Sequence, residues 1–193
     1  EQTACEITIT CNSGYSLTDG ECVSDDFDAE FTITTTNIPA NESFWFYLSA
    51  AGTYKVNWGD GNIEKIEKTN TTNELISHIY ATSGTYEIKL AGDAIRYNSD
   101  SYNNVAAIRF SYDDTDVIGN PYLKTISGSL GKIFPTLSSS TNGKLQPSFR
   151  RLFTNCENLT GAIPAELFTG VYGAPLGRMF MAAFMNTQIT EQL

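Results

Sequence analysis

Positive charge is scarce in this sequence, where 12 Lys and Arg face 22 Asp and Glu for a formal net charge of -10. Proteins that bind nucleic acid need Lys and Arg to displace the counterions around the phosphates. Binding to an anionic membrane surface has the same requirement. The charge balance therefore predicts a partner other than nucleic acid or an anionic membrane.

Long apolar runs and the common catalytic motifs are missing as well. The longest apolar candidate, Met179 to Met185, is far shorter than the roughly 20 residues that cross a bilayer, so we expect no membrane insertion. There is one histidine, His78, and there is neither a Gly-x-Ser-x-Gly motif nor a glycine loop of the kind that holds phosphates. One histidine and scattered cysteines also make a poor zinc site. These absences predict a non-catalytic protein with no cofactor and no metal, although the 22 acidic residues leave a carboxylate pair for glycoside hydrolysis open.

The residues that are abundant point to a folded, β-rich extracellular protein. Of the 193 residues, 41% are hydrophobic and only 18% are charged, which is enough to bury a core. Aromatic residues are interspersed with Thr, Ser and Asn, as is typical of strands. The chain begins at Glu1 rather than Met, which fits a signal peptide that has been removed and equally fits a chosen fragment boundary. We expect a secreted or cell-surface location.

Between residues 28 and 90 the apolar residues alternate with polar ones, as they do in half-buried strands. Turn signals separate the strands, among them Gly52 and the Ser83-Gly84 pair. The alternating positions, which we expect to face a β-sandwich core, are Phe31 and Ile33; Phe44, Phe46 and Leu48; Tyr54, Val56 and Trp58; and Tyr86, Ile88 and Leu90. A further strand is predicted where Ala106, Ile108, Phe110 and Tyr112 alternate.

Three motifs in this region occur together in PKD (polycystic kidney disease) domains. They are Val56-Asn57-Trp58-Gly59-Asp60-Gly61, then His78-Ile79-Tyr80, then Gly84-Thr85-Tyr86 with the strand to Leu90. The stretch resembles these immunoglobulin-like sandwiches, and the resemblance implies such a domain over residues 28–120. Within it Trp58 would fill the core, Asp60 would accept turn amides, and His78 would be structural.

Three of the four cysteines, Cys5, Cys11 and Cys22, fall within the first 22 residues, which predicts a stapled segment over residues 1–27. The stretch from Cys11 through Gly14-Tyr15 and Asp19-Gly20 to Cys22 resembles the last loop of epidermal-growth-factor-like modules. That resemblance implies a Cys11–Cys22 disulfide and leaves Cys5 without an assigned partner. Cys156 is expected to be a buried thiol.

The C-terminal part repeats itself. Phe149, Phe153 and Asn155 recur 31 positions later as Phe180, Phe184 and Asn186. The segment Asn158-Leu159-Thr160-Gly161-Ala162-Ile163-Pro164, with Leu167-Phe168 and Gly170, resembles the BspA-like leucine-rich repeats of bacterial surface proteins. The resemblance implies a short α/β solenoid over residues 121–193. The stripe of Phe149, Leu152 and Phe153 is predicted to lie on a short amphipathic helix.

A repeat hides its apolar face only against the next repeat, and the second copy here stops at Leu193. Met179, Phe180, Phe184 and Ile189 are therefore expected to lie on an open face. Either further repeats cover this face in a longer protein, or another copy of the chain docks on it.

Exposed aromatic residues are the best functional lead in the sequence. Trp45 and Tyr47, together with Tyr97, Tyr102 and Tyr172, are expected to lie away from the core, where aromatic rings bind partners. A calcium site at Asp113, Asp114, Asp116 and Asn120 fits no EF-hand spacing, and a solvated loop is the favoured interpretation. The function expected is adhesion to a host or neighbouring-cell protein or glycan. The alternatives are a carbohydrate-binding accessory module and a subunit that assembles with other copies of itself.

Overall fold

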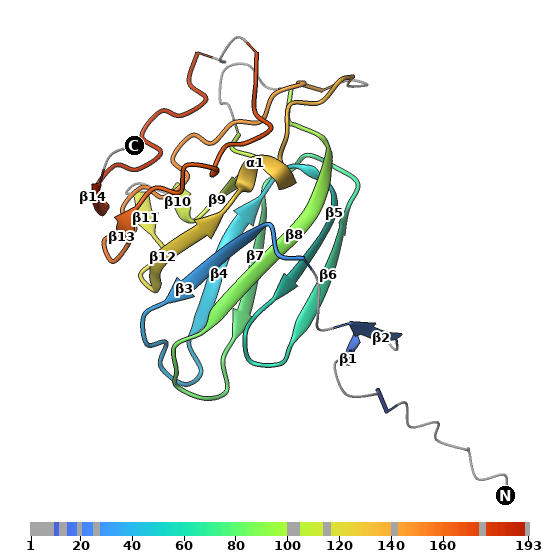
Figure 1. The fold of residues 1–193 in the computed structure, drawn as a ribbon, viewed down its shortest axis with the longest axis vertical. Coiled ribbons are helices and arrows are strands. Elements are labelled where there is room, and N and C mark those ends of the chain that lie inside the picture. The colour runs from blue at the N-terminus through green and yellow to red at the C-terminus, as the bar shows by residue number, and fades with distance from the viewer. Residues whose placement is uncertain are drawn as a thin grey trace, which may run out of the picture.

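The computed structural model describes residues 10–11, 15–18, 21–24, 28–99, 105–113, 117–139, 143–173 and 177–191. Strands account for 43% of these residues and helix is almost absent (Figure 1). The expectation of a mainly β protein is therefore confirmed. Of the helical segments expected in the C-terminal part, the described residues contain only the four-residue α1 (Leu130–Ile133).

The larger layer is a five-stranded antiparallel sheet with the strand order β12-β3-β8-β5-β6. Apolar residues alternate along these strands, so that one face of the sheet is buried and the other is solvated. The strands are β3 (Phe31–Thr35), β5 (Ala51–Asn57), β6 (Ile63–Lys68), β8 (Glu87–Arg96) and β12 (Leu123–Gly128).

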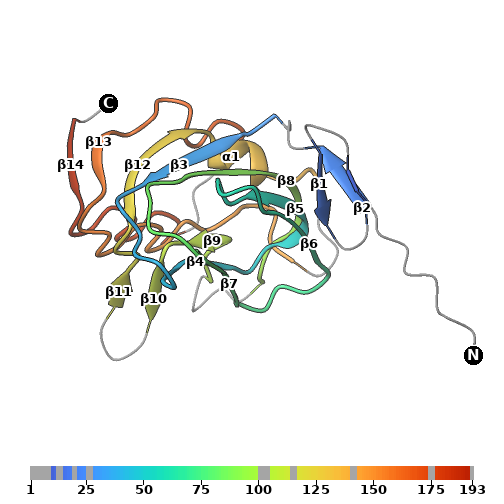
Figure 2. The same ribbon diagram turned by 90° about the horizontal axis from the view of Figure 1, so that it is seen from below.

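The second layer is a three-stranded sheet with the order β7-β4-β9, formed by β4 (Ser43–Leu48), β7 (Glu74–Ile79) and β9 (Ile108–Arg109). It lies beneath the five-stranded sheet in Figure 2. Phe44, Phe46 and Leu48 point inward from β4 and are buried. Two antiparallel sheets that enclose one core are consistent with a β-sandwich.

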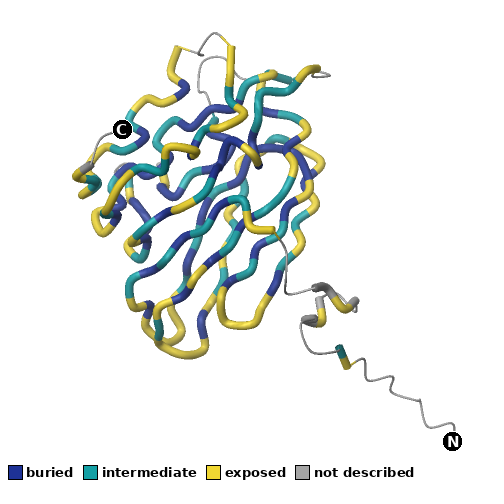
Figure 3. The backbone as a smooth tube through the Cα atoms, viewed as in Figure 1, coloured by how far each residue is buried: buried dark blue, intermediate teal, exposed yellow. Residues whose placement is uncertain are grey.

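Phe110 lies at the centre of the core and is fully buried. Its ring is 5.7 Å from that of Phe46, 6.4 Å from that of Phe31, and 5.3 Å from that of Phe153, which comes from the C-terminal part. The buried residues of the sandwich and of the C-terminal part accordingly form one continuous cluster (Figure 3). The two parts share a core.

The chain after β9 forms a hairpin of β10 (Ser111–Asp113) and β11 (Val117–Gly119) before it enters β12. The predicted strand through Phe110 is thus divided into the short strands β9 and β10. The expected domain boundary falls between residues 120 and 121, just before β12. Since β12 pairs with β3 in the larger sheet, strand pairing crosses this boundary.

The C-terminal part consists of turns stacked in layers, and its strands β13 (Thr160–Ala162) and β14 (Gln188–Glu191) pair in parallel. We call residues 148–155 the inner turn and residues 179–186 the outer turn. The predicted helix through Phe149, Leu152 and Phe153 is wrong, because Arg151 and Asn155 have positive φ values of 56° and 58°, which an α-helix does not allow. Spacings of three and four residues place side chains on one side of this turn, as they would on a helix.

Backbone hydrogen bonds connect the turns of the C-terminal part to one another and to the segment 107–110, which precedes them in the chain. The N–H of Ala107 donates to Ser148, and the N–H of Phe110 donates to Leu152, at 2.8 and 2.7 Å. The inner turn donates to the outer turn in the same way. Positions 31 residues apart in the sequence consequently lie side by side, as Phe149 and Phe180 do with ring planes 10° apart.

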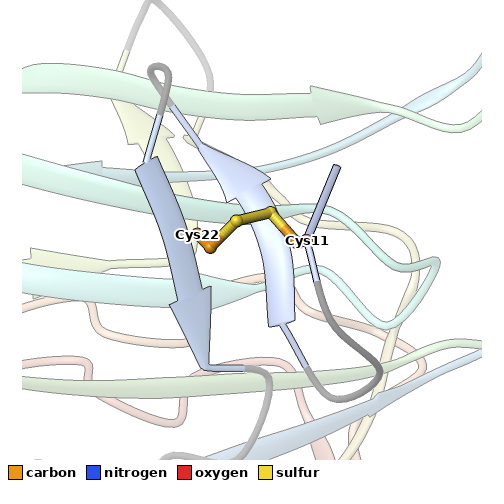
Figure 4. Close-up of a disulfide and its surroundings, with 2 residues drawn as sticks. All are labelled: Cys11 and Cys22. Carbon is orange, nitrogen blue, oxygen red and sulfur yellow. A yellow bond between two sulfur atoms is a disulfide. The ribbon is translucent and has the colours of Figure 1, made fainter. Parts of the chain in front are cut away.

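Near the N-terminus, β1 (Tyr15–Thr18) and β2 (Glu21–Ser24) pair as an antiparallel hairpin. Cys11 and Cys22 form a disulfide there, with their Cα atoms 5.4 Å apart (Figure 4). This is the pairing that the sequence predicts. Cys5 lies outside the described residues.

Candidate functional site

The turn from Trp58 to Gly61 follows β5, and the sandwich holds it firmly. The Trp58 side chain is buried and its Nε1–H donates to Glu64 at 3.2 Å. One carboxylate oxygen of Asp60 accepts the backbone N–H of Asn62 at 3.1 Å. Asp60 therefore closes the turn, in the role expected from its position between two glycines.

Stacked aromatic rings connect this turn to the other two motifs. The His78 ring lies parallel to that of Trp58 with centroids 5.1 Å apart, and its Nε2 is 2.7 Å from the other oxygen of Asp60. The Tyr80 hydroxyl donates to the carbonyl of Trp58, and the Tyr80 ring stacks on Tyr86 at 3.8 Å. The three motifs thus form one packed cluster.

The electrostatics of this cluster favour a structural role. Partial burial tends to raise the pKa of Asp60, but hydrogen bonds from His78 and from Asn62 outweigh it, so the pKa lies below its usual value. Gly84 exchanges two backbone hydrogen bonds with Ile38, so that the two residues form an isolated antiparallel β-bridge. The polar atoms described here hold the turn in place.

A second group of aromatic side chains lies on the outer face of the three-stranded sheet. We call it the aromatic patch. It surrounds a shallow hollow of about 210 Å³ lined by Trp45, Tyr47, Leu75, Tyr112 and Ile118. Trp45 and Tyr47 alternate with the buried residues of β4, as the sequence predicts. The patch brings these two residues together with three that sequence reasoning did not select.

Strand register positions every member of the patch. Leu75 lies directly opposite Tyr47 across the pairing of β4 and β7. Tyr112 lies opposite Ile118 in the β10–β11 hairpin. The hairpin is fixed beside β4 because the side-chain amide of Asn120, just after β11, donates to the carbonyl of Trp45 at 2.8 Å. The patch is therefore built on paired backbone.

The rings of the patch contact one another. Trp45 meets Tyr47 edge to face at 6.1 Å, and Tyr47 stacks on Tyr112 at 5.6 Å. The Arg109 guanidinium lies 5.3 Å from the centre of the Tyr47 ring. Burial raises the pKa of Tyr47, Tyr112 raises it further, and Arg109 lowers it. One cation thus lies against a mainly apolar surface in a chain of net negative charge.

The patch leaves large apolar side chains in solvent. Leu75 is 54% exposed and Ile118 is 55% exposed, and Tyr112 is exposed as well. Exposed apolar side chains that cluster in this way mark interaction sites more often than scattered ones do. Alternation along β7, where Leu75, Ser77 and Ile79 are all exposed, is the sequence signal that could have identified this face.

The other residues singled out in the sequence have different surroundings. Tyr97 was expected on the surface, but it is buried and its hydroxyl donates to the carbonyl of Pro135 at 2.6 Å, so that expectation is wrong. Tyr172 is exposed. Tyr102 lies outside the described residues.

The acidic loop that was considered and disfavoured as a calcium site lies partly outside the described residues. Asp114 and Asp116 are not among the described residues, while Asn120 is buried and holds the backbone beside β4. Across the described ranges no three His, Cys, Asp or Glu side chains gather as metal ligands do.

Cys156 is buried as expected, and its thiol contacts the carbonyl of Phe110. Burial raises the pKa of the thiol to about 12, opposed by a hydrogen bond from the backbone of Asn120. The thiol therefore packs as a small core side chain.

At the C-terminal end Phe180 is exposed and Phe184 is half-buried, as an open face requires. Met179 differs from the expectation, since its side chain is buried.

No helix in the described ranges is long and apolar enough to cross a bilayer. Searches of protein-family models, of curated proteins and of solved structures found nothing similar to this chain.

Proposed function

We propose that this chain is a non-catalytic interaction module of a secreted or cell-surface protein, and that it binds a partner protein through the aromatic patch. The observation that carries the proposal is the patch itself, in which Trp45, Tyr47 and Tyr112 lie together on a rigid sheet with apolar neighbours. Tyr and Trp in such positions supply much of the affinity of protein interfaces.

The composition of the patch favours a protein partner over a glycan. Sugar hydroxyls need several polar side chains as hydrogen-bond partners. The hollow is lined instead by two aliphatic and three aromatic side chains, with Arg109 beside them.

Two further features support an extracellular role. The Cys11–Cys22 disulfide suits an oxidising compartment. The resemblance of residues 28–120 to immunoglobulin-like PKD domains, and of residues 121–193 to BspA-like leucine-rich repeats, implies a surface protein that presents rigid binding faces. The layered turns and their 31-residue spacing support the second resemblance.

The test measures saturable binding of the full chain to a panel of purified extracellular-matrix proteins and to a glycan array. The patch variant is Trp45→Ser with Tyr47→Ser, and the matched control is Tyr172→Ser, which removes an exposed Tyr remote in sequence from the patch. One lost hot-spot ring costs about 2 kcal/mol or more, which is about 30-fold in affinity. Because the costs of neighbouring rings are not additive, we take this single-ring value as the smallest fall expected for the patch variant on a matrix protein. The control should bind like the unmodified chain.

Two results would contradict the proposal. One is equal binding by the patch variant and the control, provided that both melt as the unmodified chain does. The other is saturable binding to one class of polysaccharide with none to proteins, which would favour the carbohydrate-binding alternative. Stacked rings such as Tyr47 and Tyr112 are the observation that favours this alternative.

A further inference from the structure

The outer turn (179–186) has the same backbone shape as the inner turn (148–155). Ala182 and Asn186 both have φ values of 56°, in the positions held by Arg151 and Asn155 in the inner turn. In both turns some N–H groups close a tight turn on the carbonyl three residues earlier, for example Leu152 on Phe149 and Ala183 on Phe180. The remaining N–H groups of the inner turn point toward the next layer.

These remaining donors show what binds this kind of face. Four N–H groups of the inner turn donate to carbonyls of the outer turn, namely Phe149 to Met179 at 2.7 Å, Arg151 to Met181 at 2.9 Å, Phe153 to Ala183 at 2.7 Å and Asn155 to Met185 at 2.9 Å. Side chains follow the same register. The rings of Phe149 and Phe180 stack at 5.8 Å, and the amide of Asn186 donates to that of Asn155 at 2.8 Å.

The outer turn presents the same face, and no described residue lies against it as a further layer. The equivalent N–H groups are those of Phe180, Ala182, Phe184 and Asn186, and none of them has a backbone acceptor in the described part of the chain. Three large apolar side chains of this turn are also exposed, with Phe180 at 42%, Met181 at 39% and Met185 at 45%. Unpaired donors and apolar side chains together form a surface that lacks its complement.

We propose that the free face of the outer turn is a docking surface for a further unit of the same 31-residue pattern, joined to the same polypeptide after β14. Such a unit would present carbonyl oxygens at alternate residues to the four N–H groups. It would place apolar rings over Phe180 and Phe184 and an Asn amide beside Asn186. The contacts between the inner and outer turns provide the pattern for each of these interactions.

The path of the chain supports a covalently joined unit. Ala162 at the end of β13 is paired with Glu191 at the end of β14. From Ala162 the chain runs on to the outer turn, whose carbonyls accept the N–H groups of the inner turn. A segment that left Glu191 along the same path would reach the free face of the outer turn.

The direction of the hydrogen bonds disfavours a second copy as the occupant. The inner turn donates N–H groups to the outer turn, and the outer turn presents the equivalent N–H groups, so two outer turns that met would oppose donors to donors. The other end of the stack is covered, since the carbonyl of Ala107 accepts the N–H groups of Ser49 and Ala50 at 2.9 and 3.3 Å. A copy of this chain therefore has no matching carbonyl face at that end.

The experiment inserts a second copy of residues 163–191 directly after Glu191 in the full chain and follows amide hydrogen exchange by NMR. In the unmodified chain we expect the amides of Phe180, Ala182, Phe184 and Asn186 to exchange rapidly. In the extended chain they should exchange at least about tenfold more slowly, because each gains an acceptor. A matched control insert carries Asp in place of the two Phe residues that copy Phe180 and Phe184, and it should give no protection.

Four results would overturn the proposal. The first is unchanged exchange of the four amides in the extended chain. The second is an insertion that exposes the amides of the inner turn, because the face would then not tolerate a neighbour in this register. The third is protection in the unmodified chain that grows with protein concentration and accompanies a doubled mass, since a second copy would then be the occupant. The fourth is protection in the unmodified monomer, which would show that the chain covers itself. The insertion changes no residue of the aromatic patch, so the outcome of this experiment and the outcome of the binding test are independent of each other.

Discussion

Replacing Phe153 by Ala tests whether the sandwich and the stacked turns fold as one unit. The Phe153 ring is fully buried between the two parts, 5.3 Å from Phe110 and 5.5 Å from Phe184. Removal of a buried Phe side chain costs about 3 to 5 kcal/mol through lost transfer energy and the cavity that remains. For a chain of this size each kcal/mol lowers the melting temperature by about 2 to 4 °C, so we expect a fall of roughly 6 to 20 °C.

Differential scanning calorimetry measures the effect, and the number of transitions matters as much as the temperature. Because the core is continuous, the variant should show one cooperative transition at the lower temperature. Tyr172→Ser serves as the control, since that exposed side chain should change the melting temperature little. Two transitions, with only one of them shifted, would refute the shared core and restore a boundary near residue 120.

Three smaller predictions concern single side chains. Gly59→Ala should destabilise the protein by about 2 kcal/mol more than Gly61→Ala in urea unfolding, because both glycines have positive φ but only at Gly59 would a Cβ come within 2.6 Å of a backbone oxygen. Equal losses of stability in the two variants would contradict this steric reasoning. Asp60→Asn removes a carboxylate whose folded pKa is lowered by His78, so the stability that the carboxylate contributes is present above the unfolded pKa of about 3.9 and is lost as pH falls through the folded pKa. The melting temperature of the variant should therefore approach that of the unmodified chain at low pH, and a difference that stays constant with pH would speak against this. Cys156 should react with iodoacetamide only when the protein unfolds, because burial keeps the thiol protonated. Rapid labelling of Cys156 in the native protein, detected by peptide mapping, would show that the thiol is accessible.

The sandwich strands were predictable because alternation is a local property. In β4 the buried Phe44, Phe46 and Leu48 alternate with Trp45 and Tyr47, and this pattern alone defines both the core face and the outer face. The disulfide followed from a resemblance limited to one short segment. Neither required knowledge of distant contacts.

The complete aromatic patch was not predictable in the same way. Tyr112 reaches it because a hairpin folds over the edge of β4, and the contact that fixes the hairpin joins Asn120 to the carbonyl of Trp45 across 75 positions. Ile118 enters through its pairing with Tyr112. Such contacts depend on tertiary structure, which periodicity does not report.

The stacked turns show a second limit. The spacing of Phe149, Leu152 and Phe153 predicts a helix, yet Arg151 and Ala182 adopt the left-handed conformation that usually favours glycine. The hydrogen bonds between layers hold these residues there. The local conformational preference of these residues is overridden by contacts with a turn 31 positions away. The sequence pattern therefore identified the repeat but not the backbone conformation of its turns.

The stacking of the turns also ties their stability to the sandwich. Carbonyls of the inner and outer turns accept N–H groups from the layer before them, and the segment at Ala107 rests on Ser49 and Ala50 of the sandwich. The sandwich thus supports the turns that stack on it. Trimming the chain from its C-terminal end should remove one layer and leave the earlier layers intact, whereas a defect near Ala107 should prevent all later layers from forming. The stability of the outermost turn is therefore inherited from residues more than seventy positions earlier in the chain.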